Sequence, residues 1–140
     1  KKYNCKITTP LDVLTGKDMS GESEIKSLKE IDKNDYILDI GPKTIKKIID
    51  IIEQTKTILW NGPAGYFENP NFAIGSVKIA NFIAQKNKEK GIYSVAGGGD
   101  TVSLLNSIKL TNNFNFVSTA GGAFLEYLEG KSLPGISALN

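Results

Sequence analysis

Short apolar runs alternate with longer amphipathic segments along most of this chain, and this alternation constrains the fold more than any other feature. The apolar runs have the length of strands and lie at residues 36–40, 57–60, 92–96 and 114–118. The segments between and after them carry apolar residues at helical spacing and lie at residues 42–53, 71–90, 102–108 and 122–129. Strands that alternate with helices form a parallel sheet with helices on its faces. We therefore expect a three-layer α/β/α fold of the Rossmann-like class.

The first expected helix shows the pattern most clearly. Four isoleucines recur at intervals of three and four residues, at positions 45, 48, 49 and 52, and Pro42 suits the first helical turn. Ahead of this helix we interpret residues 5–15 as a strand followed by a turn at Pro10. Residues 17–35 are rich in charge, and we interpret them as a surface excursion that carries no chemistry.

Composition removes several classes of function. The 140 residues include 17 lysines and 15 acidic residues, which gives a net charge of +2, and neither histidine nor arginine occurs. Without histidine the chain cannot supply a Ser-His or Cys-His nucleophile or an imidazole metal ligand. The balanced charge does not favour nucleic-acid binding, and no uncharged apolar run approaches the about 18 residues of a membrane span. Because Cys5 cannot form an internal disulfide, we expect a reducing, cytoplasmic setting.

Three strand-to-helix junctions, at residues 61–68, 97–101 and 118–122, are the candidate sites. In a parallel sheet they lie at the carboxyl edge, where ligands of open α/β sheets bind. The junction GGGDT at 97–101 predicts a phosphate site, since glycines allow close approach and a helix N-terminus presents unpaired N–H groups. There Asp100 could hold Mg²⁺ and Thr101 could donate a hydroxyl. The structural alternative is that Asp100 is only a helix N-cap.

The other two junctions extend this hypothesis. The junction STAGG at 118–122 repeats the arrangement one strand over, so that two helix N-termini could grip one polyphosphate. In the junction at 61–68, Gly62, Ala64 and Phe67 would face a nucleoside ring and Glu68 the ribose hydroxyls. Alternatively, Phe67 belongs to the core and Glu68 is simply exposed. For Trp60 we favour a place in the core, because aromatic residues at strand ends usually pack.

Several motifs, in this order along the chain, closely resemble phosphoglycerate kinases. They are PxD at 10–12, DIGP at 39–42, WNGPxGxFE at 60–68, GGGDT at 97–101, STxGGA at 118–123 and LExLEGKxLPG at 125–135. The resemblance implies that residues 1–140 are the C-terminal portion of the nucleotide-binding domain, an incomplete half of a two-domain kinase without its N-terminal substrate domain. Since the only methionine is Met19, we also expect a processed chain or a piece of a larger one.

The resemblance also implies roles for individual residues. Those that match nucleotide-binding positions are Gly62, Ala64, Phe67, Glu68, Gly98, Gly99, Asp100 and Thr101, with Asp100 also at the Mg²⁺ site. Gly121 and Gly122 match the helix N-terminus that steadies the transferred phosphoryl group and are the candidate catalytic positions. Ala120 departs from the family, since many members have glycine there.

The implied reaction is reversible phosphoryl transfer between 1,3-bisphosphoglycerate and Mg-ADP, which gives 3-phosphoglycerate and ATP, by a monomeric glycolytic enzyme. This chain would supply nucleotide binding and would be inactive alone. Two alternatives stay open: a stand-alone nucleotide-binding module without catalysis, and a structural α/β domain whose glycines only cap helices. Because half of a nucleotide domain should expose sheet edges and apolar surface, we expect marginal stability or pairing with another chain.

Overall fold

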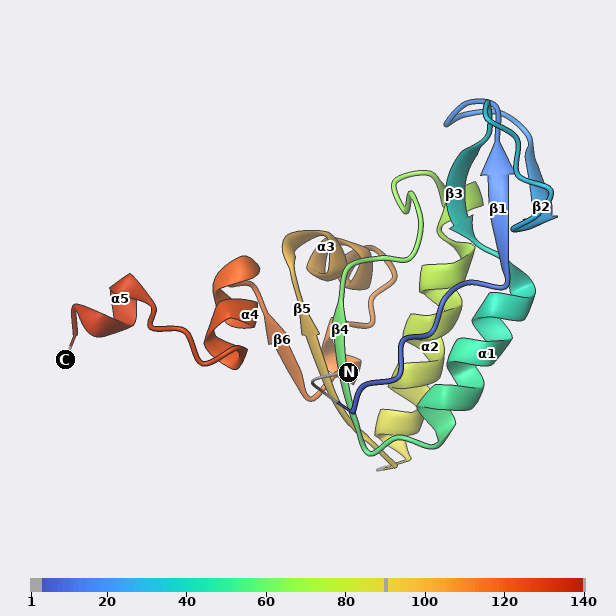
Figure 1. The fold of residues 1–140 in the computed structure, drawn as a ribbon. Helices are drawn as coiled ribbons and strands as arrows, with labels where there is room; N and C mark the ends of the chain where they lie inside the picture. Colours follow the sequence, from blue (N-terminus) through green and yellow to red (C-terminus); the bar gives the residue numbers. More distant parts are fainter. Residues whose placement is uncertain (1–3, 90, 140) are drawn as a thin grey trace.

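Two three-stranded sheets of different kinds organise the chain (Figure 1). The computed structural model describes residues 4–89 and 91–139. One sheet is antiparallel, with the order β2-β1-β3, and its strands are β1 (Asp12–Gly16), β2 (Ser23–Ser27) and β3 (Tyr36–Ile40). The other sheet is parallel, with the order β4-β5-β6, and its strands are β4 (Thr57–Asn61), β5 (Tyr93–Gly97) and β6 (Phe116–Ser118).

The four predicted helices are all present. They are α1 (Pro42–Glu53), α2 (Ile74–Lys88), α3 (Gly99–Ser107) and α4 (Gly122–Leu128). A short α5 (Pro134–Ser137) and two 3₁₀ turns, η1 (Pro70–Phe72) and η2 (Thr111–Asn113), complete the described elements. The helix expected over 71–90 begins later, because η1 occupies its first residues, and residue 90 lies outside the described part of the chain.

The parallel sheet is covered unequally on its two faces. Helices α1, α2 and α3 pack on the face that carries Trp60, Ala96 and Val117, and together they form the hydrophobic core. Right-handed crossovers place successive helices on the same face when strands are added in one direction, as in the order β4-β5-β6. The three-layer α/β/α prediction is confirmed, although α4 makes only a small second helical layer.

The second face of the parallel sheet is largely open and apolar. Leu59 is 46% exposed and Phe116 is 50% exposed. A hollow of about 260 Å³ on this face is lined by side chains of all three strands and of α4, including Leu59, Tyr93, Val95, Phe116, Phe124 and Leu128. In the described residues β4 and β6 each pair with β5 alone, so both are edge strands. The expected exposure of sheet edge and apolar surface is therefore confirmed.

The first 40 residues differ from the expectations in two respects. The strand expected before Pro10 is absent, since residues 4–11 form no strand, and β1 (Asp12–Gly16) begins after Pro10 instead. The missing N–H of proline suits a position ahead of a strand better than its interior. The charged segment 17–35 contains a strand, β2, where we expected none. Strand β3 pairs antiparallel with β1, Val13 opposite Ile40, and does not join the parallel sheet. Its place was decided by this partner, which alternation with helices could not reveal.

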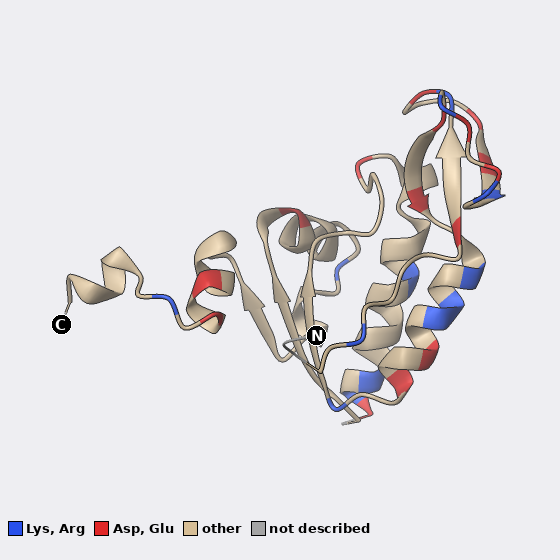
Figure 2. Ribbon diagram, in the orientation of Figure 1, with Lys and Arg blue, Asp and Glu red and all other residues tan. Residues whose placement is uncertain are grey.

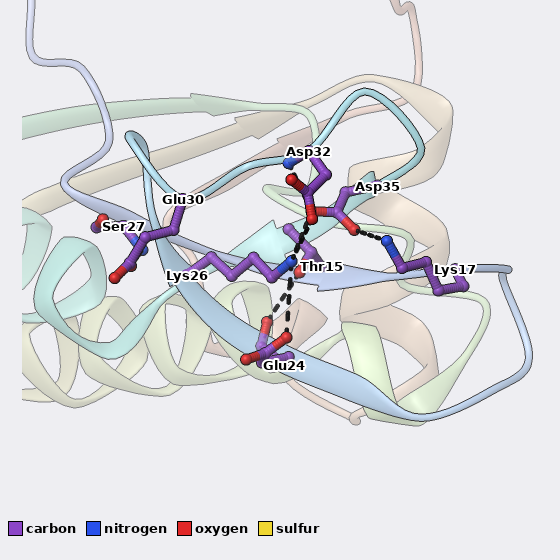
Figure 3. A network of polar contacts seen from close by, with 8 residues as sticks. All are labelled: Thr15, Lys17, Glu24, Lys26, Ser27, Glu30, Asp32 and Asp35. Carbon is purple, nitrogen blue, oxygen red and sulfur yellow. Dashed lines mark hydrogen bonds and ion pairs between the residues drawn. The ribbon is translucent and has the colours of Figure 1, made fainter.

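An ion-pair network fastens the antiparallel sheet (Figure 3). The carboxylate of Asp35 accepts hydrogen bonds from Lys17 Nζ at 2.7 Å and Lys26 Nζ at 2.8 Å. The Asp32 amide donates to the same carboxylate at 2.8 Å. The hydrogen bonds from Lys17 and Lys26 are the main cause that lowers the pKa of Asp35. The network thus ties Lys26 of β2 to Asp35, the residue before β3, and to Lys17, the residue after β1.

A second buried carboxylate joins this sheet to α1. Asp12 is 2% exposed and accepts hydrogen bonds from the amides of Lys43 (3.0 Å) and Thr44 (2.8 Å) and from the Thr44 hydroxyl (2.8 Å). Burial alone would raise the pKa of Asp12, but these hydrogen bonds outweigh burial and lower it. Asp12 therefore caps α1 from a distant strand, since Gly41 at the N-cap position has no side chain.

Candidate nucleotide site

The carboxyl ends of the three parallel strands meet at one edge, as predicted. Gly97 at the end of β5 lies between Asn61 at the end of β4 and Ser118 at the end of β6, in direct register with both. The three glycine-containing junctions therefore begin side by side, and α3 and α4 leave from neighbouring strand ends (Figure 1). This confirms that the parallel sheet gathers the junctions along one edge.

At the junction between β5 and α3, Gly97 is buried, Gly98 is half-buried and Gly99 is exposed. Gly98 is the N-cap of α3, with φ of 95°, and a β-carbon there would lie 2.9 Å from Asn61 Oδ1. A side chain is therefore excluded at this position by both conformation and space. Val102 is the first residue whose amide donates to the helix start, to Gly98 O at 3.0 Å. The amides of Gly99, Asp100 and Thr101 lie before the first helical hydrogen bond and have no acceptor within the helix.

Asp100 and Thr101 occupy different environments. The side chain of Asp100 is exposed in the first turn of α3, and because Gly98 is the N-cap, the alternative of Asp100 as a cap is wrong. Thr101 is fully buried, and its hydroxyl oxygen accepts a hydrogen bond from the Gly62 amide at 2.7 Å. Thr101 thus connects two of the three junctions. Asp100 is free to reach a ligand.

The junction between β6 and α4 has the same form. Gly121 is the N-cap of α4, with φ of 52°, and both Gly121 and Gly122 face open space on the side where a β-carbon would lie. Ala120 keeps a negative φ, since Lys109 is the only non-glycine residue with positive φ in the described chain. The methyl group of Ala120 therefore introduces no backbone strain at this junction.

The loop after β4 is anchored at alternate amides. Gly62 donates to Thr101 as described, Ala64 N–H donates to the hydroxyl of Ser76 at 2.7 Å, and Tyr66 N–H donates to Leu38 O at 2.7 Å. Ala64 and Glu68 are exposed and Phe67 is half-buried. Trp60, by contrast, stacks on Phe114 with ring centroids 6.1 Å apart and packs against the core, as we expected. The loop therefore has a fixed backbone and an accessible surface.

Two polar residues beside this loop were given no role from the sequence. Ser76 is fully buried in the first turn of α2, and Asp39 is 1% exposed at the end of β3. Burial raises the pKa of Asp39, although the amides of Gly75 and Ile40 donate to its carboxylate and act in the opposite direction. The signals for Asp39 were an acidic residue in an otherwise apolar run and its place as the first residue of the DIGP motif at 39–42, to which no role was assigned. Nothing in the sequence distinguished Ser76 from other helix residues.

The residues at the carboxyl edge of the parallel sheet are suited to a metal ion that takes most of its ligands from phosphate and water oxygens. In the described part of the chain no three His, Cys, Asp or Glu side chains gather into a metal-binding group. Asp100 is therefore the one carboxylate offered at the start of α3, beside the exposed Gly99. Mg²⁺ commonly takes one or two protein carboxylates and completes its shell with phosphate oxygens and water. The donor set fits Mg²⁺ bound with a polyphosphate.

Comparison with known proteins identifies the family. The family model "Phosphoglycerate kinase" matches residues 1–131. The chain belongs to the phosphoglycerate kinase family. It is 48% identical over 140 residues to the phosphoglycerate kinase of Buchnera aphidicola subsp. Schizaphis graminum. The matched region covers 99% of this chain and 35% of that protein. It is 45% identical over 141 residues to the phosphoglycerate kinase of Caulobacter vibrioides, again over 99% of this chain and 36% of that protein.

Solved structures of the family agree with the fold. The phosphoglycerate kinase of Coxiella burnetii is 39% identical, with a TM-score of 0.84 over 95% of this chain and 34% of that one. The enzyme of Pyrococcus horikoshii OT3 is 33% identical, with a TM-score of 0.77 over 94% and 32%. The chain spans about a third of the length of the phosphoglycerate kinases that it matches. Within the residues that the structure describes, no helix is long and apolar enough to cross a membrane.

Proposed function

We propose that this chain is the C-terminal portion of the nucleotide-binding domain of a phosphoglycerate kinase and binds Mg-ADP and Mg-ATP at the edge formed by β4, β5 and β6. The observation that carries the proposal is the pair of glycine-capped helices, α3 and α4, that leave neighbouring strand ends. Each helix N-terminus favours negative charge. Two of them side by side suit a polyphosphate better than a single phosphate.

The residues divide by the part of the nucleotide that they would bind. The loop after β4 would hold the nucleoside, with Gly62, Ala64 and Phe67 against the ring and Glu68 on the ribose. The exposed side chains of Ala64 and Glu68 and the anchored backbone support this assignment. A rigid loop with an open surface loses little conformational entropy when a ligand binds.

The start of α3 would hold the phosphates and the metal ion. The amides of Gly98 and Gly99 would donate to phosphate oxygens, and Asp100 would bind Mg²⁺. Thr101 is buried, and its hydroxyl accepts a hydrogen bond from the Gly62 amide. Both observations favour a structural role for this hydroxyl, which would fix the two junctions relative to each other.

Gly121 and Gly122 would act on the phosphoryl group in transfer. Phosphoryl transfer between a carboxylate and a nucleotide needs positioning and stabilisation of charge on the equatorial oxygens, and little covalent help. Backbone amides are suited to this role, and one well-placed donor can be worth about 3 kcal/mol. The acceptor carboxylate of 3-phosphoglycerate needs no general base, which agrees with the residues offered at this edge.

The remainder of the proposal concerns the complete enzyme. The relatives are about three times as long as this chain, and we assign the binding of 3-phosphoglycerate and 1,3-bisphosphoglycerate to a separate N-terminal domain. The enzyme would act in glycolysis in the cytoplasm, in keeping with the single free and exposed Cys5. The 140-residue chain would then bind nucleotide without catalysing transfer.

Two experiments test the proposal. Calorimetric titration of the chain with Mg-ADP should release heat and give one site, and a chain without nucleotide binding would instead be a structural α/β domain. For activity, residues 1–140 are grafted in place of the matching segment of the Buchnera aphidicola enzyme. The hybrid should make ATP from 1,3-bisphosphoglycerate and ADP. A folded hybrid that binds nucleotide but makes no ATP would favour the stand-alone binding module.

A further inference from the structure

Asp39 lies behind the proposed nucleoside loop, against Gly65 within the loop and Gly75 at the start of α2. Its Oδ2 accepts a hydrogen bond from the Gly75 amide at 2.7 Å, in the first turn of α2. Its Oδ1 accepts one from the Ile40 amide at 2.8 Å. A β-carbon at Gly65, within the loop, would lie 2.6 Å from Oδ1, and one at Gly75 would lie 2.5 Å away. The carboxylate therefore fills the space that two glycines leave open.

The loop backbone docks on the same strand end. Tyr66 N–H donates to the carbonyl of Leu38, the residue before Asp39, at 2.7 Å. Two residues earlier, Ala64 N–H donates to the hydroxyl of Ser76, the residue after Gly75, at 2.7 Å. The loop is thus held between β3 and α2, and Asp39 is the side chain that joins these two elements.

We propose that Asp39 is a positioning residue for nucleotide binding: by holding Gly75 and packing against Gly65, it fixes the loop that presents Ala64, Phe67 and Glu68. This inference rests on the proposed function, in which that loop binds the nucleoside. Asp39 itself does not reach the ligand, because its side chain is buried and both of its oxygens accept amide protons from within the fold.

The energetics favour positioning over simple stabilisation. Burial removes water from the carboxylate and disfavours its charged form, which is why burial raises the pKa of Asp39. No lysine salt bridge to Asp39 occurs among the described residues, so only amide donors compensate its burial. What Asp39 provides is two acceptors with fixed directions: Oδ2 for the Gly75 amide of α2 and Oδ1 for the amide of its own neighbour in β3, Ile40. An asparagine could accept only one of the two hydrogen bonds and would place an NH₂ group against the other amide.

The test compares Asp39→Asn with Asp50→Asn, an exposed carboxylate of α1 that pairs with Lys46. Both substitutions are made in the Buchnera aphidicola hybrid, and each variant is assayed at a temperature where circular dichroism shows it fully folded. We expect Asp39→Asn to raise the Kd and KM for Mg-ADP about tenfold with kcat nearly unchanged, because a loosened loop must be ordered by the ligand. Asp50→Asn should leave both constants unchanged.

Amide hydrogen exchange provides a second measurement that does not depend on the variant folding. In the unsubstituted hybrid without nucleotide, the amides of Ala64, Tyr66 and Gly75 should already be protected. Rapid exchange there, or a Kd of Asp39→Asn equal to that of the unsubstituted hybrid, would overturn the role of Asp39 while leaving the proposed function standing. If the unsubstituted hybrid binds no nucleotide, the proposed function itself fails, and the inference fails with it.

Discussion

The two sheets of this chain differ in whether the polar groups of their region are paired within the protein. In the antiparallel sheet and α1, the carboxylates of Asp12 and Asp35 are surrounded by donors from the fold itself. The strands of the parallel sheet, TILWN, YSVAG and FVS, contain no charged residue, and the helices α3 and α4 that follow have no side-chain caps. Figure 2 shows this contrast, with charge gathered along α1 and the antiparallel strands and little on β4, β5 and β6.

The difference separates polar groups that build the fold from those available to a ligand. A donor or acceptor that is paired inside the protein contributes to stability, and its loss leaves a buried partner unsatisfied. A helix N-terminus that faces open space contributes little to stability but keeps its donors for a ligand. Substitutions in the first region should therefore change stability, and substitutions at the strand ends of the second should change binding.

The largest effect is expected at Asp12. In Asp12→Ala the amides of Lys43 and Thr44 lose their acceptor inside the protein, so the free energy of unfolding should fall by about 3 kcal/mol. Urea unfolding followed by circular dichroism measures this change. The matched control is Asp50→Asn, whose exposed ion pair with Lys46 should be worth no more than about 0.5 kcal/mol. A loss at Asp12 as small as the loss at Asp50 would contradict distant capping of α1.

A smaller and different effect is expected at Asp100. Asp100→Asn should weaken Mg-ADP binding about tenfold, because it removes the carboxylate proposed to hold the metal ion. Its unfolding free energy should stay within about 0.5 kcal/mol of the unsubstituted chain, since the side chain is exposed. Calorimetry with and without Mg²⁺ makes the measurement. Equal weakening in the absence of Mg²⁺ would show that Asp100 does not act through the metal.

The pH dependence of stability should also reflect the antiparallel region. The pKa values of Asp12 and Asp35 are lowered in the folded chain, so their contribution is fully present above the ordinary aspartate pKa of about 4 and is lost as pH falls through the lowered values. Asp39 acts in the opposite direction: its pKa is raised, so its contribution is present below the ordinary value and lost as pH rises through the raised one.

Urea midpoints measured from acid to neutral pH should therefore fall on the acid side. Asp35→Asn should make this fall shallower, because the variant lacks one of the groups that must be protonated. An acid limb unchanged by Asp35→Asn would mean that the ion pairs of Asp35 with Lys17 and Lys26 do not contribute to stability in solution.

The smallest effect on stability is expected on the open face of the parallel sheet. Leu59→Thr keeps a residue with high strand propensity and removes apolar surface that is already 46% exposed, so the unfolding free energy should change by less than about 1 kcal/mol. Self-association of the 140-residue chain, measured by sedimentation, should decrease. A melting temperature of the unsubstituted chain that does not depend on concentration would contradict association through this face.

Much of the parallel region could be predicted from sequence because its signals are local. The apolar runs gave β4, β5 and β6 to within two residues, and the isoleucine spacing and Pro42 gave α1. Strand β2 could not be predicted, because SEIKS has the composition of a surface loop and is a strand only through its pairing with β1. The strand direction of β3 was missed for the same reason.

The candidate site divides in the same way. The place of the glycines at 98, 121 and 122 at helix starts could be predicted, because glycine followed by a helical segment is a local sequence pattern. The roles of Asp39, Ser76 and the Thr101 hydroxyl could not, because each acts on a residue at least 12 positions away. Hydrogen bonds between residues so far apart in the chain produce no periodic pattern in the sequence.

The sequence by itself therefore determined the strands of the parallel sheet, the helices beside them, the glycine-rich junctions and the family. Each of these features depends on residues that are neighbours in the chain. Only the tertiary structure decided that the first three strands form a separate antiparallel sheet, that α4 covers little of the open face, and that the buried carboxylates of Asp12 and Asp39 accept hydrogen bonds from the first turns of α1 and α2. The physical reason is that a buried charge is tolerated only where the fold brings donors to it, and those donors come from distant parts of the chain.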